Sequence, residues 1–138
     1  MPALKRILTI IVIFTILGLT LSCVGKVEQP GVLAGTVKIG PIWPVERPGE
    51  NPPVPQEVFE ARRVMVYDKN GNKLIETVSI IQIDHSQEGH YSVQLKPGTY
   101  TVDINRGGID RSSAVPKEVE IKAGQTVTLD ISIDTGIR

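Results

Sequence analysis

A strict alternation of apolar and polar residues constrains this chain more than any other feature. A period of two places every apolar side chain on one face of a β-strand, and it recurs here in about seven short segments separated by turn residues. No segment carries the 3.6-residue period of an amphipathic helix. The pattern therefore predicts an all-β, seven-stranded antiparallel β-sandwich. The predicted strands cover residues 35–39, 63–68, 73–83, 91–95, 100–104, 119–121 and 127–133.

Turn chemistry sets two finer expectations. Asn70 and Gly71 follow the second predicted strand, and both residue types tolerate positive φ, so we expect a tight hairpin there. Within residues 73–83, Val78 and Ile80 share one parity with Leu74, and Ile81 and Ile83 take the other. That change predicts a bulge or a bend between two short strands.

A proline-rich segment interrupts the alternation. Residues 40–55 hold six of the ten prolines, and proline lacks the amide donor that a central strand needs, so we expect a loop. Residues 107–116 form a second predicted loop. Trp43 has two interpretations: it caps one end of the sandwich core, or it presents an aromatic platform to a sugar ring or a peptide. The candidate ligand or partner residues are Trp43, Glu46, Arg47 and Arg138.

The N-terminal residues have the organisation of an export signal. Lys5 and Arg6 precede an apolar run of fifteen residues, 7–21. At about 1.5 Å per residue, this run is shorter than a hydrocarbon core of roughly 30 Å. Ser22 then stands directly before Cys23, the only cysteine of the chain. This arrangement resembles the lipobox of bacterial lipoproteins, in which the cysteine is acylated and becomes the mature N-terminus.

The lipobox resemblance divides the chain into a lipoprotein signal peptide (1–22), a lipidated tether (23–30) and a β-sandwich domain (31–138). It implies a membrane anchor through lipid on Cys23, on the extracytoplasmic face of the cell membrane or the outer membrane. More than one buried acyl chain gives stable anchoring, whereas a single chain is marginal. Two alternatives are an uncleaved anchor that extends to Val24 and a signal that is cleaved without lipidation.

Charge argues against a nucleic-acid partner. The chain has fifteen basic and fifteen acidic residues, and removal of residues 1–22 takes away two basic ones, which leaves a net charge of −2. Phosphate binding depends on clustered positive charge, which such a balance does not supply.

One stretch resembles the signature of carboxypeptidase regulatory-like domains: Gly89-x-Tyr91-x-Val93-x-Leu95-x-Pro97-Gly98-Thr99-Tyr100. The resemblance extends over residues 32–133. It implies a transthyretin-like or Cna-B-like β-sandwich, with Ig-like layering, and it carries no catalytic residue.

The two ends of the domain resemble a group of uncharacterised bacterial exported proteins. The matching motifs are Gly40-Pro41-x-x-Pro44-Val45-Glu46 and the terminal Asp134-Thr135-Gly136-Ile137-Arg138. In such proteins a cysteine often stands where Trp43 stands here, so the resemblance implies that Trp43 anchors the loop by packing. It also motivates the hypothesis that Arg138 pairs with Glu46 or with another acid of the first loop.

Some Cna-B-like domains form a covalent isopeptide bond between a lysine of the first strand and a partner on the last. Lys38 and Asp130 occupy those strands here. Both have outward parity, and the reaction needs buried groups, so no isopeptide bond is expected.

Two turns imitate calcium-binding loops: Asp68-x-Asn70-x-Asn72 and Asp84-x-Ser86-x-Glu88. The first lacks a glycine at the sixth position and an acid at the twelfth, so ordinary turns are the expected structures. His85 and His90 fall in no metal-binding motif. Neither a metal nor a cofactor is predicted.

No catalytic motif supports an enzyme, because the chain has no nucleophile elbow, zinc-binding histidine pair or phosphate loop. The sequence favours a non-enzymatic, lipid-anchored module for binding or structural support at the cell envelope, with an envelope protein or a glycan as partner. The alternative is a carbohydrate- or peptidoglycan-binding module that uses the Trp43 loop.

Overall fold

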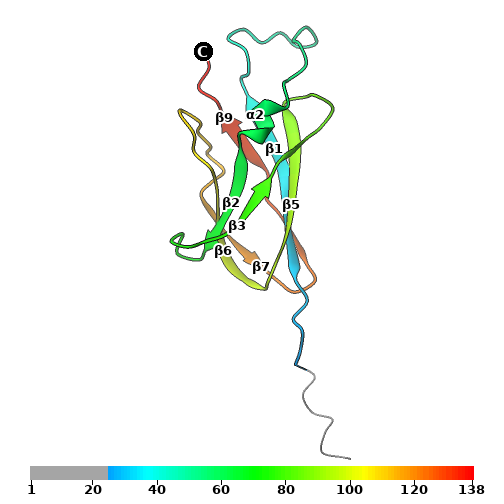
Figure 1. The fold of residues 1–138 in the computed structure, drawn as a ribbon, viewed down its shortest axis with the longest axis vertical. Helices are drawn as coiled ribbons and strands as arrows, with labels where there is room; N and C mark the ends of the chain where they lie inside the picture. The colour runs from blue at the N-terminus through cyan, green and yellow to red at the C-terminus, as the bar shows by residue number, and fades with distance from the viewer. Residues whose placement is uncertain (1–24) are drawn as a thin grey trace, which may run out of the picture.

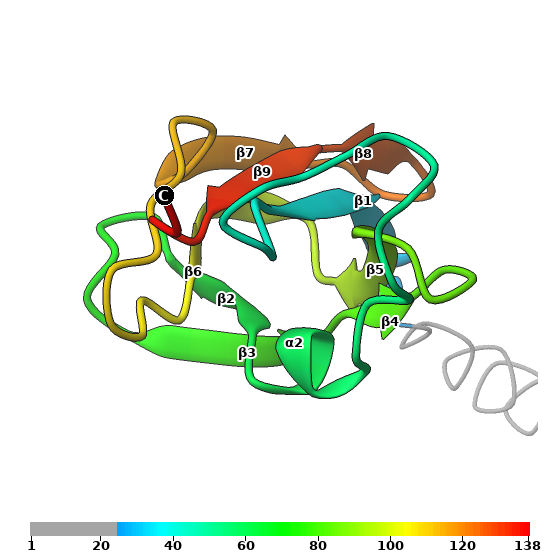
Figure 2. The ribbon, with the colours of Figure 1, turned by 90° about the horizontal axis from the view of Figure 1, so that it is seen from above.

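The computed structural model describes residues 25–138, and over this range the chain forms nine strands in two packed sheets (Figures 1 and 2). One sheet has the order β4-β5-β1-β8, with β9 also paired to β1, and the other has the order β3-β2-β6-β7. The predicted β-sandwich is therefore confirmed. The elements are β1 (Gly31–Gly40), α2 (Glu57–Glu60), β2 (Arg63–Asp68), β3 (Leu74–Ser79), β4 (Ile81–Gln82), β5 (Glu88–Leu95), β6 (Gly98–Ile104), β7 (Lys117–Ile121), β8 (Thr126–Thr128) and β9 (Ile131–Asp134).

The predicted strand number needs a correction, because two of the predicted strands are divided. The bend expected within residues 73–83 separates β3 from β4 at the buried Ile80. The last predicted strand, residues 127–133, is divided between β8 and β9 around Leu129 and Asp130.

The predicted antiparallel pairing is confirmed for the strand pairs β1–β5, β2–β3, β2–β6, β4–β5 and β6–β7, and it is wrong for the pairs that join β1 to β8 and β9. β1 runs antiparallel to β5, but it pairs in parallel with both β8 and β9. Alternation decides the face on which a side chain lies, and it contains no information about the direction of the neighbouring strand.

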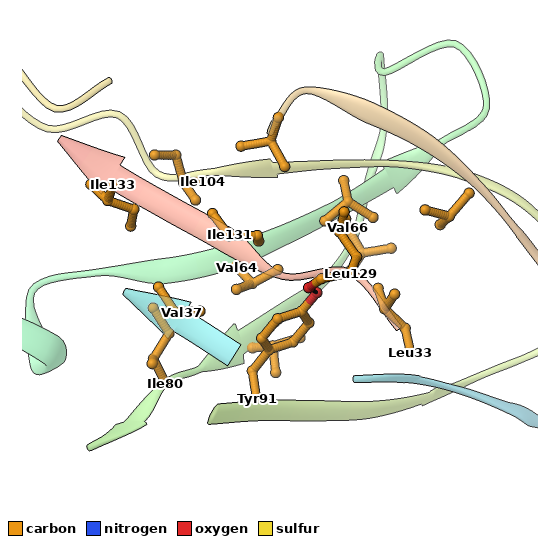
Figure 3. Close-up of a cluster of buried hydrophobic side chains, with 14 of the residues drawn as sticks. Leu33, Val37, Val64, Val66, Ile80, Tyr91, Ile104, Leu129, Ile131 and Ile133 are labelled. Carbon is orange, nitrogen blue, oxygen red and sulfur yellow. Dashed lines mark hydrogen bonds between the residues drawn. The ribbon is translucent and has the colours of Figure 1, made fainter. Parts of the chain in front are cut away.

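The core lies between the two sheets and is filled from both by alternating inward side chains (Figure 3). Leu33, Val37 and Ile39 of β1 are fully buried, and Val64 and Val66 of β2 face them from the other sheet. Full burial of an aliphatic side chain of this size stabilises a fold by about 1.5–3 kcal/mol.

The hairpin between β2 and β3 differs in one detail from the expected geometry. Gly71 has a φ of 73°, but among the described non-glycine residues only Asp84 and His85 have positive φ, so Asn70 does not. The Gly71 N–H donates to the Asp68 carbonyl at 2.9 Å, and the Asp68 carboxylate accepts the N–H of Asn72 at 2.7 Å. The first calcium-like motif is thus a turn in which backbone N–H groups already bond the Asp68 carboxylate and carbonyl.

The two ends of the sandwich differ. Residues 25–30 are exposed and leave the domain at one end, where the N–H of Gly124 donates to the Pro30 carbonyl. The proline-rich loop, the 107–116 loop and the C-terminal residues lie at the opposite end (Figure 1), which we call the loop end. Within residues 25–138 no helix is both long and apolar enough to span a bilayer. The predicted signal peptide and Cys23 lie outside the described residues.

Candidate binding site at the loop end

Backbone hydrogen bonds join three separate segments at the loop end. The 107–116 loop contacts β9 through a pair of bonds between Arg111 and Asp134, at 2.9 and 2.7 Å. The next residue, Thr135, donates its N–H to the Gly40 carbonyl at 3.2 Å and its hydroxyl to the Pro41 carbonyl. The C-terminal segment therefore fastens the start of the proline-rich loop to the 107–116 loop.

An ion pair attaches the 107–116 loop to the residues that follow α2. The Arg62 guanidinium donates two hydrogen bonds to the Asp110 carboxylate, at 2.8 and 3.0 Å. Both side chains are mostly buried, with 17% of Arg62 and 8% of Asp110 exposed. Bidentate geometry fixes the orientation of both groups.

Trp43 lies partly buried against the hydrophobic core and also lines an open hollow of about 420 Å³. The other walls of this hollow, which we call the Trp43 hollow, come from residues 51–54 and 84–87. The indole thus contributes to the core and to a solvent-accessible surface, so the two interpretations drawn from the sequence are compatible with one position.

The Glu46 carboxylate fastens the proline-rich loop to the connection between β4 and β5. It accepts the N–H of Ile42 at 2.7 Å and the side-chain amide of Gln87. The hypothesis that Arg138 pairs with Glu46 or with another acid of the first loop is wrong, because Arg138 pairs with Asp134 of β9 at 2.9 Å. Arg138 lies only four residues beyond Asp134, so the guanidinium reaches this carboxylate within its own segment.

The Arg138 guanidinium and the Gly136 N–H both donate to Asp134, and they lower the pKa of that carboxyl to about 2.

Arg47, the remaining predicted residue, contacts Glu50 at 3.7 Å across an exposed turn. An exposed pair of this kind contributes little to stability.

A second hollow of about 420 Å³, the Phe59 hollow, lies beside the first. It is lined by Gln56, Phe59, Glu60, Ile80, Ile81, Gln82, Asp84 and His85. Asp84 and His85 line both hollows and form the wall between them. Sequence reasoning did not identify the Phe59 hollow, because α2 is too short to show a helical period.

Hydrogen bonds hold the dividing wall in place. The N–H of Val54 donates to the His85 carbonyl at 2.8 Å. The side-chain amide of Gln82 donates to the carbonyls of Val54 and Ser86, at 3.0 Å each. The second calcium-like motif is therefore also part of a turn.

Of the remaining sequence candidates, Lys38, Asp130 and His90 lie outside the two hollows, whereas His85 lines both. Lys38 and Asp130 are both exposed, as their outward parity predicted, and Asp130 accepts hydrogen bonds from Thr36. His85 and His90 are exposed. Among residues 25–138 there is no group of three or more His, Cys, Asp or Glu side chains arranged to hold a metal ion.

No family model matches the chain, and no curated protein matches it. Among solved structures, the Bacillus anthracis TIE protein is similar over 78% of this chain and 17% of its own length, with 17% identity and a TM-score of 0.43. The minor pilin GBS52 of Streptococcus agalactiae is similar over 78% of this chain and 45% of its own length, with 18% identity and a TM-score of 0.45. Both TM-scores are below 0.5, so the fold assignment rests on the sheet topology.

Proposed function

We propose that this protein is a non-enzymatic, lipid-anchored β-sandwich that presents its loop end to a protein partner in the cell envelope. One observation carries the proposal: residues 25–30 leave the domain at the end opposite the proline-rich loop, the 107–116 loop and the C-terminal segment (Figure 1). A lipid on Cys23 would lie two residues before this described segment. The loop end would then face away from the membrane, on a rigid scaffold.

The side chains of the loop end also suit a protein-binding role. Val45 and Ile109, from its two loops, are 69% and 63% exposed. Each loop therefore exposes one large apolar side chain that a protein partner would cover on binding.

The anchor is tested first by labelling cells with a palmitate analogue. We expect label on the wild-type chain and in the membrane fraction, and neither for Cys23→Ala. Cys23→Ala protein that still carried lipid or still sedimented with membranes would contradict the anchor.

Site-specific photo-cross-linking in cells tests the orientation and the partner class. A photoreactive residue at Val45 or Ile109 is expected to capture one dominant envelope protein. The matched control is Ala123, which is also exposed but lies in the turn beside the tether. Capture from Ala123 alone would contradict the proposed orientation, and capture of glycan from the loop positions would favour the second candidate.

The second candidate is a glycan-binding module, and the Trp43 hollow specifically favours it. The partly buried indole shares the lining of this hollow with Asn51 and Gln87. An indole can stack on a sugar ring, and side-chain amides can hydrogen-bond the sugar hydroxyls. Trp43 is the only tryptophan, so its fluorescence reports on this hollow. Saturating peptidoglycan fragments should shift the emission if this candidate is correct, and an unchanged spectrum would exclude it.

A further inference from the structure

The paired hollows at the loop end allow the partner's chemistry to be specified further. Their dividing wall is the turn between β4 and β5, where Asp84 and His85 have φ values of 46° and 53°. The N–H of Ser86 closes this turn on the Ile83 carbonyl at 2.9 Å. Two consecutive left-handed residues are the geometry of a type I′ turn, which Asn-Gly usually supplies. Here the same geometry holds a carboxylate and an imidazole at the boundary of the two hollows.

The lining of the hollows combines apolar side chains with carboxylates. Phe59, Ile80 and Ile81 all line the Phe59 hollow; the first two are almost fully buried, and Ile81 is 59% exposed. The charged lining residues are Glu60 and Asp84, and neither hollow is lined by a lysine or an arginine among the described residues. An occupant that matches this lining carries a positive charge on an apolar stem.

We propose that the two hollows together bind an extended peptide segment of the partner that bears a lysine or an arginine. Such a side chain lays its aliphatic stem against Ile81 and brings its cation to Glu60 and Asp84, which both line the Phe59 hollow. This inference rests on the proposed function, because it specifies how the envelope protein would contact the loop end.

One extended segment can reach both hollows because they share a wall. Along a β-strand, side chains two positions apart point the same way and are separated by about 7 Å. A basic side chain in the Phe59 hollow therefore brings the side chain two positions away over the Asp84–His85 wall. An apolar side chain at that position packs against Trp43 and Pro53.

The test uses the full chain in uncharged detergent micelles and the probe peptide acetyl-Gly-Lys-Ala-Leu-Gly-amide. Its control replaces lysine by norleucine, which keeps the stem and removes the charge. Titrations are followed by Trp43 fluorescence and by amide chemical shifts at Asp84 and His85. We expect saturable binding of the lysine peptide, roughly fivefold weaker binding of the norleucine peptide, and affinity that falls with added salt.

Two neutralised carboxylates and one matched control identify the site. Glu60→Gln and Asp84→Asn should each weaken binding of the lysine peptide roughly fivefold. Glu57→Gln removes a charge from the same helix but outside both hollows, so it should leave the affinity unchanged. Equal binding of the two peptides, or equal effects of Glu57→Gln and Glu60→Gln, would overturn the inference.

The outcomes also separate this inference from the proposed function. Capture of an envelope protein from Val45 or Ile109, together with failure of the peptide to bind, would reject the peptide site and retain the module. Charge-dependent binding of the peptide, with no partner captured from the loop end in cells, would retain the site and reject the proposed function.

Discussion

The Tyr91 hydroxyl donates a 2.6 Å hydrogen bond to the carbonyl oxygen of Leu129, in the core between β5 and the final strands (Figure 3). In a regular parallel ladder this carbonyl would accept the N–H of Thr36, because Leu129 N–H already donates to the Ala34 carbonyl at 2.9 Å. The Thr36 N–H instead donates to the Asp130 carboxylate at 2.8 Å. Two side chains thus replace one backbone bond at the gap between β8 and β9.

Removal of the Tyr91 hydroxyl should destabilise the fold. Tyr91 is 1% exposed, so Tyr91→Phe leaves the buried Leu129 carbonyl without that donor, and we expect a loss of about 1–3 kcal/mol in the free energy of unfolding. Urea unfolding followed by Trp43 fluorescence measures it. Tyr100→Phe is the control, because the Tyr100 hydroxyl bonds the Lys96 carbonyl at an exposed site where water can substitute. Equal losses for the two variants would contradict the special role of Tyr91.

Gly35 is required by the close approach of β1 to the same carbonyl. A Cβ atom at this position would lie 2.0 Å from the Leu129 oxygen and 3.1 Å from the Tyr91 ring. Backbone must therefore move in Gly35→Ala, and we expect a loss of about 2 kcal/mol or more in stability. At Gly107 a Cβ atom would meet nothing within 4 Å, so Gly107→Ala should be close to neutral. Thermal unfolding that ranks the two substitutions in the reverse order would refute this account.

Acid should weaken the contact between Asp130 and Thr36. Backbone and side-chain hydrogen bonds from Thr36 lower the pKa of Asp130 in the folded chain. The contribution of a carboxyl whose pKa is lowered by folding is complete above its unfolded pKa, about 3.9, and is lost as the pH falls through the folded value.

We therefore expect the urea midpoint of the wild-type chain to decrease from about pH 5 downward more steeply than that of Asp130→Asn. The Asp130→Asn side chain keeps an acceptor for Thr36 but has no charge to titrate. Thr36→Val removes one of the two donors and should give an intermediate slope. Parallel profiles for all three chains would show that Asp130 does not contribute to acid sensitivity.

The ion pair between Arg62 and Asp110 should contribute more to stability than the exposed ion pair of the proline-rich loop. Asp110→Asn leaves a mostly buried guanidinium without its charged partner, and we expect a loss of about 2 kcal/mol. The comparison is Glu50→Gln, which breaks the exposed pair with Arg47 and should cost less than about 0.5 kcal/mol. Urea unfolding of both variants decides the point, and losses of equal size would contradict the burial argument.

Much of the fold could be predicted from the sequence because the strand period is local. The parity of Val37, Val64 and Tyr91 identified the inward face, and each of them is buried. The proline-rich loop and the bend at Ile80 could also be predicted, because their signals are local. Prolines lack the N–H that a strand needs, and the change of apolar parity at Ile80 lies within one short segment.

The site could be predicted only in part. Trp43 and Glu46 stood out by their residue types, but the Phe59 hollow joins α2 to the connection between β4 and β5. It depends on how closely those segments pack, which no local pattern records. The expected pairing of Arg138 with Glu46 was wrong because a nearer carboxylate, Asp134, belongs to the same segment.

The sequence by itself determined where most of the strands lie, which of their faces is buried and where the main loops fall. Only the tertiary structure decided that β8 and β9 lie parallel to β1, with Leu129 bonded to Tyr91, and that two hollows share the Asp84–His85 wall. The reason is physical: side-chain alternation follows from the two-residue repeat of a strand. Strand order depends on hydrogen bonds between backbone groups that lie far apart in the chain. Because these groups are chemically alike at almost every residue, the sequence does not show which strands will pair.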